Sequence, residues 1–224
     1  MSYTRRIVCL ANSKKMTGRC VAGLEVVGSS LKGWIRPVSA RATEEVSLDE
    51  RRYENGQDVQ LLDIVEIQFL EPRPHTCQVE NHLIDDAEHW RHIGSFESGK
   101  LASHATHSGP LWLDVSSSYN GTSDRIPVAD ADRLDHSLKL VQPDALRIWV
   151  GRGYKKRQVR AAFQLGKAHY NLGVTDTKVE ARYLAMKDGE YAYPTKAVMC
   201  VSLGEPFDGY RYKLVASIID LPQQ

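Results

Sequence analysis

The chain has 224 residues, of which 42% are hydrophobic and 25% are charged, and its formal net charge is +1. This length allows one large domain or two domains of roughly 110 residues each. No stretch approaches the ~20 consecutive apolar residues of a membrane-spanning helix. Lys14 and Lys15 soon follow the first apolar run, so we expect no signal peptide. The four cysteines are widely spaced and form no CxxC pair, so we expect reduced thiols and a cytoplasmic location.

The basic residues are concentrated in two segments of the chain. Residues 1–36 carry seven Lys and Arg side chains against one acid, Glu25, and residues 151–160 carry five with no acid. A near-neutral chain that contains such segments is typical of a protein with one positive face. We therefore expect folding to bring both segments onto one continuous cationic surface.

Alternating apolar and polar residues predict β-strands in the first half, at 6–11, 19–27, 33–38 and 61–70. In the last of these, Val65, Ile67 and Phe69 should face the core, and the prolines at 72 and 74 should end the strand. Short helices are expected at 47–53, with Ser47 as N-cap, and at 85–93. The stretch 94–110 is rich in Gly, Ser and His, and it marks the expected junction between domains at 1–108 and 109–224.

The second half again reads mainly as strands, which are expected at 138–141, 146–151, 158–165, 169–174, 197–203 and 212–219. A helix is expected at 177–186, with Thr177 as N-cap and Glu180 at the capping-box position. Each half thus offers about five strands and one or two short helices. This inventory predicts a mainly β fold of two OB-like small barrels in tandem. The sequence shows no internal repeat, so the likeness of the halves rests on the element counts.

Several motifs resemble those of the dual OB-containing domain family of prokaryotes, and the resemblance runs over nearly the whole chain. They are Ser13-Lys14-Lys15, GRCVAG at 18–23, GWIRPVS at 33–39, QVENHLI at 78–84, YNLGVTD at 170–176, SLGEPFDGYRYKLVASII at 202–219 and the basic segment before residue 159. The resemblance implies two OB-like barrels that bind nucleic acid in a DNA-modification or defence system. It implies no catalytic residue.

Two motifs combine aromatic and basic residues. In GWIRPVS, Trp34 and Arg36 share one strand face, so Trp34 could stack on a base while Arg36 contacts a phosphate or a base edge. The alternative is a buried Trp beside a structural Arg. In GRGYKKRQVR, an aromatic residue adjoins three cations in a turn, and the alternative is a solvated basic hairpin. The candidate nucleic-acid-binding residues are Lys14, Lys15, Arg19, Trp34, Arg36, Tyr154, Lys155, Lys156, Arg157 and Arg160.

Three further patterns leave alternatives open. In QVENHLI, Gln78, Glu80 and His82 would share a strand face and could read base edges, or the segment is simply a strand edge. In GYRYKLV, Tyr210 and Tyr212 lie opposite Arg211 and Lys213, which favours closure of the second barrel over extension of a binding sheet. The histidines and the cysteine between 75 and 92 fit no standard zinc spacing, so we expect neither a metal nor a cofactor.

The leading hypothesis is a protein that binds nucleic acid, with single-stranded or modified DNA favoured over RNA, and that has partner proteins in a modification or defence complex. A second hypothesis is an enzyme acting on a modified nucleobase or nucleotide. Cys20 would then be the nucleophile and Glu80 the general acid or base, although a cysteine is more often a small buried hydrophobe. A third is a protein-interaction subunit whose basic hairpin meets an acidic partner.

Overall fold

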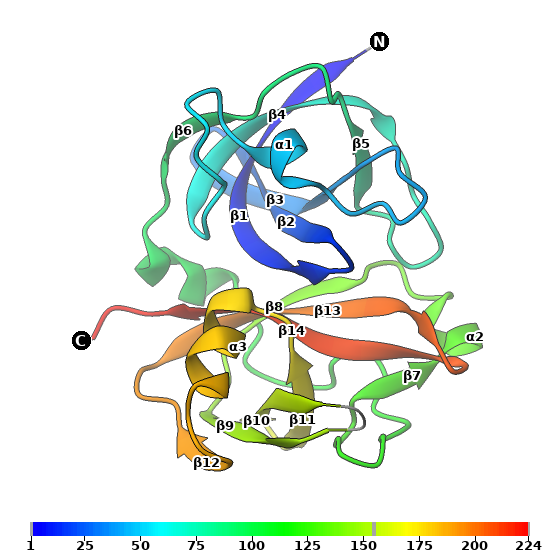
Figure 1. The fold of residues 1–224 in the computed structure, drawn as a ribbon, viewed down its shortest axis with the longest axis vertical. Helices are drawn as coiled ribbons and strands as arrows, with labels where there is room; N and C mark the ends of the chain where they lie inside the picture. The colour runs from blue at the N-terminus through cyan, green and yellow to red at the C-terminus, as the bar shows by residue number, and fades with distance from the viewer. Residues whose placement is uncertain (1, 154–155, 224) are drawn as a thin grey trace. The chain divides into compact units, whose positions relative to one another are not determined.

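The computed structural model describes residues 2–153 and 156–223, and Figure 1 shows its fold. The chain divides into two compact units, Met1–Glu97 (unit 1) and Ser98–Gln224 (unit 2), and each is described by itself. Both consist mainly of strands with a few short helices, which confirms the expected fold class. No helix in the described residues is long and apolar enough to cross a membrane.

Unit 1 is a closed five-stranded barrel with one added strand. Its strands follow the order β1-β2-β3-β5-β4, and β4 pairs back onto β1, which closes the barrel. The β3–β5 pair is parallel and the other pairs are antiparallel, while β6 extends the sheet beyond β4. The elements are β1 (Tyr3–Lys15), β2 (Gly18–Val27), β3 (Ser30–Val38), α1 (Leu48–Arg51), β4 (Asp63–Pro72), β5 (Asn81–Ile84) and β6 (Arg91–Ser95).

The core of unit 1 follows from the period of two along its strands. On β4, the side chains of Val65, Ile67 and Phe69 are buried, and they pack with Ile7 of β1 and Ile35 of β3 in one hydrophobic cluster. This confirms the face predicted from the sequence. On β2 and β3 the partly or fully exposed residues lie towards the strand ends, at Arg19, Cys20 and 25–27 on β2 and at 30–34 on β3, while 21–24 and 35–38 are buried.

The described part of unit 2 forms an eight-stranded sheet, in which seven strands follow the order β12-β9-β10-β11-β14-β13-β8 and β7 pairs with β14. Its elements are η1 (Ser98–His104), β7 (Arg125–Pro127), α2 (Val128–Ala131), β8 (Leu138–Val141), β9 (Ala145–Arg152), β10 (Arg157–Leu165), β11 (Ala168–Val174), α3 (Thr177–Leu184), β12 (Gly189–Ala192), β13 (Ala197–Phe207) and β14 (Tyr210–Asp220).

The strand order of unit 1 recurs within unit 2. The path β9-β10-β11-β14-β13 matches β1-β2-β3-β5-β4, including the parallel pair β11–β14 and a helix after the third strand. The end strands differ, because β9 pairs with β12 and β13 pairs with β8. The two units are therefore one OB topology used twice, closed in unit 1 and extended at both ends in unit 2.

Two predictions about helices are wrong. No helix forms at 85–93: the segment is a turn that leads into β6, and Trp90 is 1% exposed in the core of unit 1. The second concerns α3, whose N-cap is Asp176 and not Thr177. The Asp176 carboxylate accepts hydrogen bonds from the backbone N–H groups of Lys178 (3.0 Å) and Val179 (3.1 Å) and also from that of Ile218 (3.1 Å) on β14. The cap thereby ties α3 to the sheet.

Candidate functional site

The β1–β2 hairpin of unit 1 places two cations directly opposite each other. Lys14 and Arg19 are cross-strand partners near the turn, and Lys14 is exposed while Arg19 is partly exposed. Within the described residues, neither side chain has a carboxylate partner. Lys15 differs because it lies near Glu45. Burial raises the pKa of Glu45, but hydrogen bonds from Thr43 and Thr17 and the charge of Lys15 lower it overall.

The β9–β10 hairpin of unit 2 has the same arrangement. Arg152 and Arg157 are cross-strand partners at its end, and Lys156 is exposed beside them. Arg157 is held in place, since its guanidinium donates to Asp188 (2.8 Å) and to the main-chain oxygens of Leu184 (2.9 Å) and Met186 (2.8 Å). The predicted site residues Tyr154 and Lys155 lie outside the described residues.

The two hairpins occupy the same position in the shared strand order, between its first and second strands. Like charges directly opposite each other on a sheet destabilise it. In unit 1 neither cation of the pair has a carboxylate partner among the described residues, so the pair lowers folding stability, whereas in unit 2 the ion pair of Arg157 with Asp188 offsets part of that cost. In OB barrels, this loop is one of those that bind oligonucleotides and oligosaccharides. The arrangement is thus able to bind a polyanion.

Trp34 lies on β3 opposite Leu24 of β2 and is partly exposed. Its predicted neighbour Arg36 has a different environment. The Arg36 side chain is almost fully buried and forms an ion pair at 3.1 Å with Glu80, which is equally buried, and its backbone N–H donates to the Glu80 main-chain oxygen (2.8 Å). In this conformation Arg36 has no surface for a phosphate, so we assign it a structural role.

Arg160 is also internal, at 7% exposure. Its guanidinium donates to Asp124 (2.8 Å), which is 1% exposed, and to the side-chain and main-chain oxygens of Asn171. Asp124 also accepts from the backbone N–H (2.7 Å) and the hydroxyl (2.6 Å) of Ser118. Arg160 therefore fixes the segment 118–124 against β10 and β11, and it is unavailable to a ligand in this conformation.

The comparison with known families agrees with this repeated topology. The chain matches the dual OB-containing domain over residues 5–218. It belongs to the dual OB-containing domain family. No curated protein and no solved structure matches the chain. For the dual OB chain, the candidate site therefore rests on its own residues and on the general behaviour of OB barrels.

The two residues considered for catalysis in the dual OB chain are not joined by a hydrogen bond. Cys20 lies on β2 opposite Ser13 and is partly exposed, and in the described part of the chain it has no hydrogen bond to a carboxylate or an imidazole. Glu80 is buried against Arg36. The geometry that would activate a Cys20 thiolate, a base within hydrogen-bond reach, is not present among these residues.

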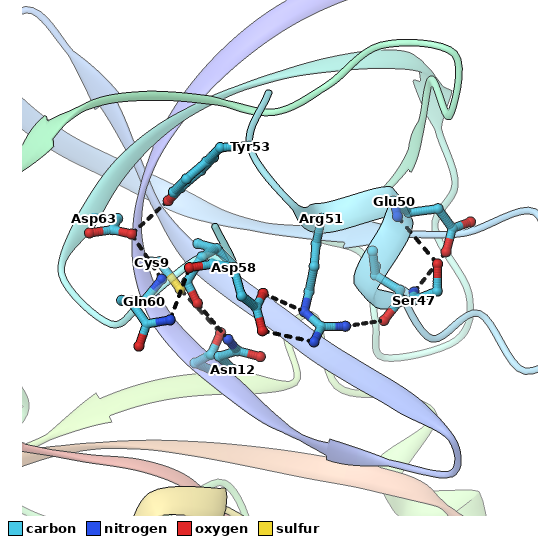
Figure 2. Close-up of polar contacts among 12 residues, drawn as sticks. Cys9, Asn12, Ser47, Glu50, Arg51, Tyr53, Asp58, Gln60 and Asp63 are labelled. Carbon is cyan, nitrogen blue, oxygen red and sulfur yellow. Dashed lines mark hydrogen bonds and ion pairs between the residues drawn. The ribbon is translucent and has the colours of Figure 1, made fainter. Parts of the chain in front are cut away.

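A partly buried polar cluster that the sequence did not suggest lies between residues 47–63 and strand β1 of unit 1 (Figure 2). The Tyr53 hydroxyl donates to Asp63 (2.6 Å), and Arg51 donates to both oxygens of Asp58 (2.8 and 2.9 Å). Cys9 lies in the same cluster, and burial together with the charge of Asp63 raises the pKa of its thiol. Because the thiol stays protonated and inaccessible, we assign this cluster to stability.

The polar segment before β5 also departs from expectation. β5 begins at Asn81, so Gln78 and Glu80 precede the strand and do not share a strand face with His82. Both are buried, and the Asn81 amide donates to Gln78 (3.2 Å). No group of three or more His, Cys, Asp or Glu side chains within residues 2–153 and 156–223 is placed to hold a metal ion.

Proposed function

We propose that the dual OB chain binds nucleic acid and that each unit holds phosphates at the end of its first hairpin. The observation that carries the proposal is the repeated cross-strand pair of cations, Lys14 with Arg19 and Arg152 with Arg157. An anion placed between two such side chains converts a repulsion into two attractions. The chain would therefore gain more from a polyanion than from any neutral ligand.

Cations without an internal carboxylate partner are the ones best able to bind phosphate. Lys14, Arg19 and Arg152 have no carboxylate partner in the described chain, and Lys156 is exposed. Each phosphate that such a cation neutralises releases condensed counterions, which supplies most of the affinity of non-specific binding. Arg157 would contribute less as a mobile contact, because its guanidinium already has three partners.

The finer part of the proposal is a preference for single-stranded DNA. The partly exposed ring of Trp34 on the third barrel strand supports it, because an unpaired base can stack on an aromatic side chain and a paired base cannot. A preference for modified DNA, and a role in a DNA-modification or defence complex with partner proteins, rest on the resemblance of the motifs alone.

Charge reversal on each hairpin tests the proposal. Binding of a labelled single-stranded DNA to the full chain is measured by fluorescence anisotropy for K14E/R19E and for R152E/K156E. We expect at least about a tenfold loss of affinity from each pair. The matched controls are Arg52→Glu, an exposed cation directly after α1 in unit 1, and Lys167→Glu, an exposed cation at the β10–β11 turn of unit 2, which should change affinity little. Equal losses in the controls, or no binding by the wild type at low salt, would contradict the proposal.

A further inference from the structure

Strand β14 of unit 2 carries its charged side chains inside and its aromatic side chains outside. Arg211 is 1% exposed and Lys213 is fully buried. Arg211 forms an ion pair with Asp132 (2.8 Å) and donates to the Gly204 oxygen (3.2 Å). Lys213 forms an ion pair with Asp114 (2.6 Å) and donates to the Leu113 oxygen (2.8 Å). The prediction that Arg211 and Lys213 share a face holds, but that face is the interior.

This orientation is costly, and a simple alternative exists. Burying a cation costs free energy that its ion pair only partly offsets. A shift of the pairing register by one residue would exchange the two faces, so that Tyr210 and Tyr212 filled the interior and the cations reached water. Burial indeed lowers the pKa of Lys213, against the opposing effect of Asp114. Such costly departures from a local folding rule are often found at functional sites. Here the departure leaves the rings of Tyr210 and Tyr212 on the outer face.

The outward face forms a continuous group of rings at the β13–β14 hairpin. Phe207 is 70% exposed and is the cross-strand partner of Tyr210. The rings of Phe207 and Tyr212 lie 6.3 Å apart between centroids. On β7, the Arg125 guanidinium lies 3.9 Å from the Tyr210 ring centroid and donates to the Ser116 hydroxyl (3.1 Å). We call Phe207, Tyr210, Tyr212 and Arg125 the aromatic face.

A tight turn keeps the aromatic face in place before any ligand binds. The two residues that join β13 to β14, Asp208 and Gly209, have φ values of 51° and 78°. Positive φ at both central residues is typical of a type I′ turn, whose twist matches that of paired strands. Rings on such a rigid hairpin lose little entropy on binding.

We propose that the aromatic face stacks the unpaired bases of a single-stranded nucleic acid. This inference rests on the proposed function, since it identifies where unit 2 would receive bases while the β9–β10 hairpin holds phosphates. The β13–β14 hairpin joins the fourth and fifth strands of the OB order, and OB barrels bind oligonucleotides with this loop as well. Asp208 is exposed in the turn next to Phe207 and repels phosphates, so a strand would approach this face with its bases.

Two oligonucleotides of equal length separate stacking from phosphate binding. One is single-stranded oligothymidine, and the other has the same backbone with abasic sites throughout. We expect Phe207→Ala to weaken binding of oligothymidine about fivefold or more and to leave binding of the abasic strand unchanged. Phe207→Trp should preserve binding of both. Leu48→Ala removes a similarly exposed apolar side chain, at 51% exposure in unit 1, and should change neither.

Each outcome bears on one proposal or both. Equal affinity of Phe207→Ala and wild type for oligothymidine would overturn the stacking inference, and so would an equal loss on both strands. In either case the proposed function would stand, provided that the wild type binds the abasic strand and K14E/R19E does not. A wild type that binds neither strand at low salt would contradict both proposals.

Discussion

The buried cations show what decides the place of a charged residue in this chain. Arg160, Arg211 and Lys213 each lie in the interior because a distant carboxylate faces them, from 36, 79 and 99 residues away in the sequence. A basic residue with a buried partner and one that binds phosphate look alike in a local pattern. The sequence proposed all four as binding residues, but it could not separate the accessible Lys14 and Arg19 from the buried Arg36 and Arg160.

Removal of the Asp124 carboxylate should strongly destabilise unit 2. In Asp124→Ala, the nearly buried Arg160 keeps its charge without its partner, which costs about 3–5 kcal/mol of unfolding free energy. The control is Asp188→Ala, which breaks the exposed ion pair with Arg157 and should cost about 0–1 kcal/mol. Urea denaturation measures both variants, and similar costs for the two would contradict the structural role of Arg160.

His82 predicts a dependence of stability on pH. Burial and the charge of Arg5 lower its pKa, and its Nδ1 lies within hydrogen-bond distance of the Tyr3 hydroxyl (2.5 Å). Below about pH 6.5 the unfolded chain binds a proton that the folded chain resists, so stability is full above that pH and falls as the pH is lowered further. His82→Asn should flatten the fall in denaturation midpoint between about pH 7 and pH 5. The exposed control His75→Asn should not, and a similar slope in both variants would refute the assignment.

At the scale of elements, the sequence predicted what a local pattern controls. The buried face of β4 and the Ser47 N-cap of α1 follow from spacing alone. The segment 85–93 failed because its main signal is tertiary: Trp90 is buried in the core and forms a bridge with Tyr53. The outward orientation of Phe207 and Tyr210 could not be predicted locally either. It depends on the ion pairs that Asp132 and Asp114 form with the cations on the opposite face of β14.

The cations at the hairpins should lower the free energy of unfolding while strengthening DNA binding. Arg152→Thr removes one member of a like-charged cross-strand pair, so it should raise the unfolding free energy by about 0.2–1 kcal/mol at low salt, and the gain should shrink as salt screens the repulsion. It should also weaken DNA binding. Arg147→Thr is the control on the same strand, because Arg147 pairs with Glu190 (3.0 Å) and its removal should bring no gain. Thermal unfolding at two salt concentrations distinguishes the variants, and a loss of stability in Arg152→Thr would contradict the argument.

At the scale of the whole molecule, the sequence predicted two OB-like barrels but not the form of their likeness. What repeats is the order of the ladders, β1-β2-β3-β5-β4 and β9-β10-β11-β14-β13, while the residues differ. Two units can share a strand-pairing pattern without sharing a sequence, because many different sequences can form the same pattern of backbone hydrogen bonds. The net charge of +1 is compatible with two cationic hairpins, because the compensating acidic residues lie on other elements.

The salt dependence of single-stranded DNA binding tests the central claim most directly. For the wild type, the logarithm of the association constant should fall linearly with the logarithm of the salt concentration. Removing Lys14 and Arg19 together should make that slope shallower by roughly 1.4, at about 0.7 for each phosphate that is no longer neutralised, and removing Arg152 and Lys156 should do the same. A wild-type slope near zero, or a slope that neither pair of substitutions changes, would contradict phosphate binding by the two hairpins.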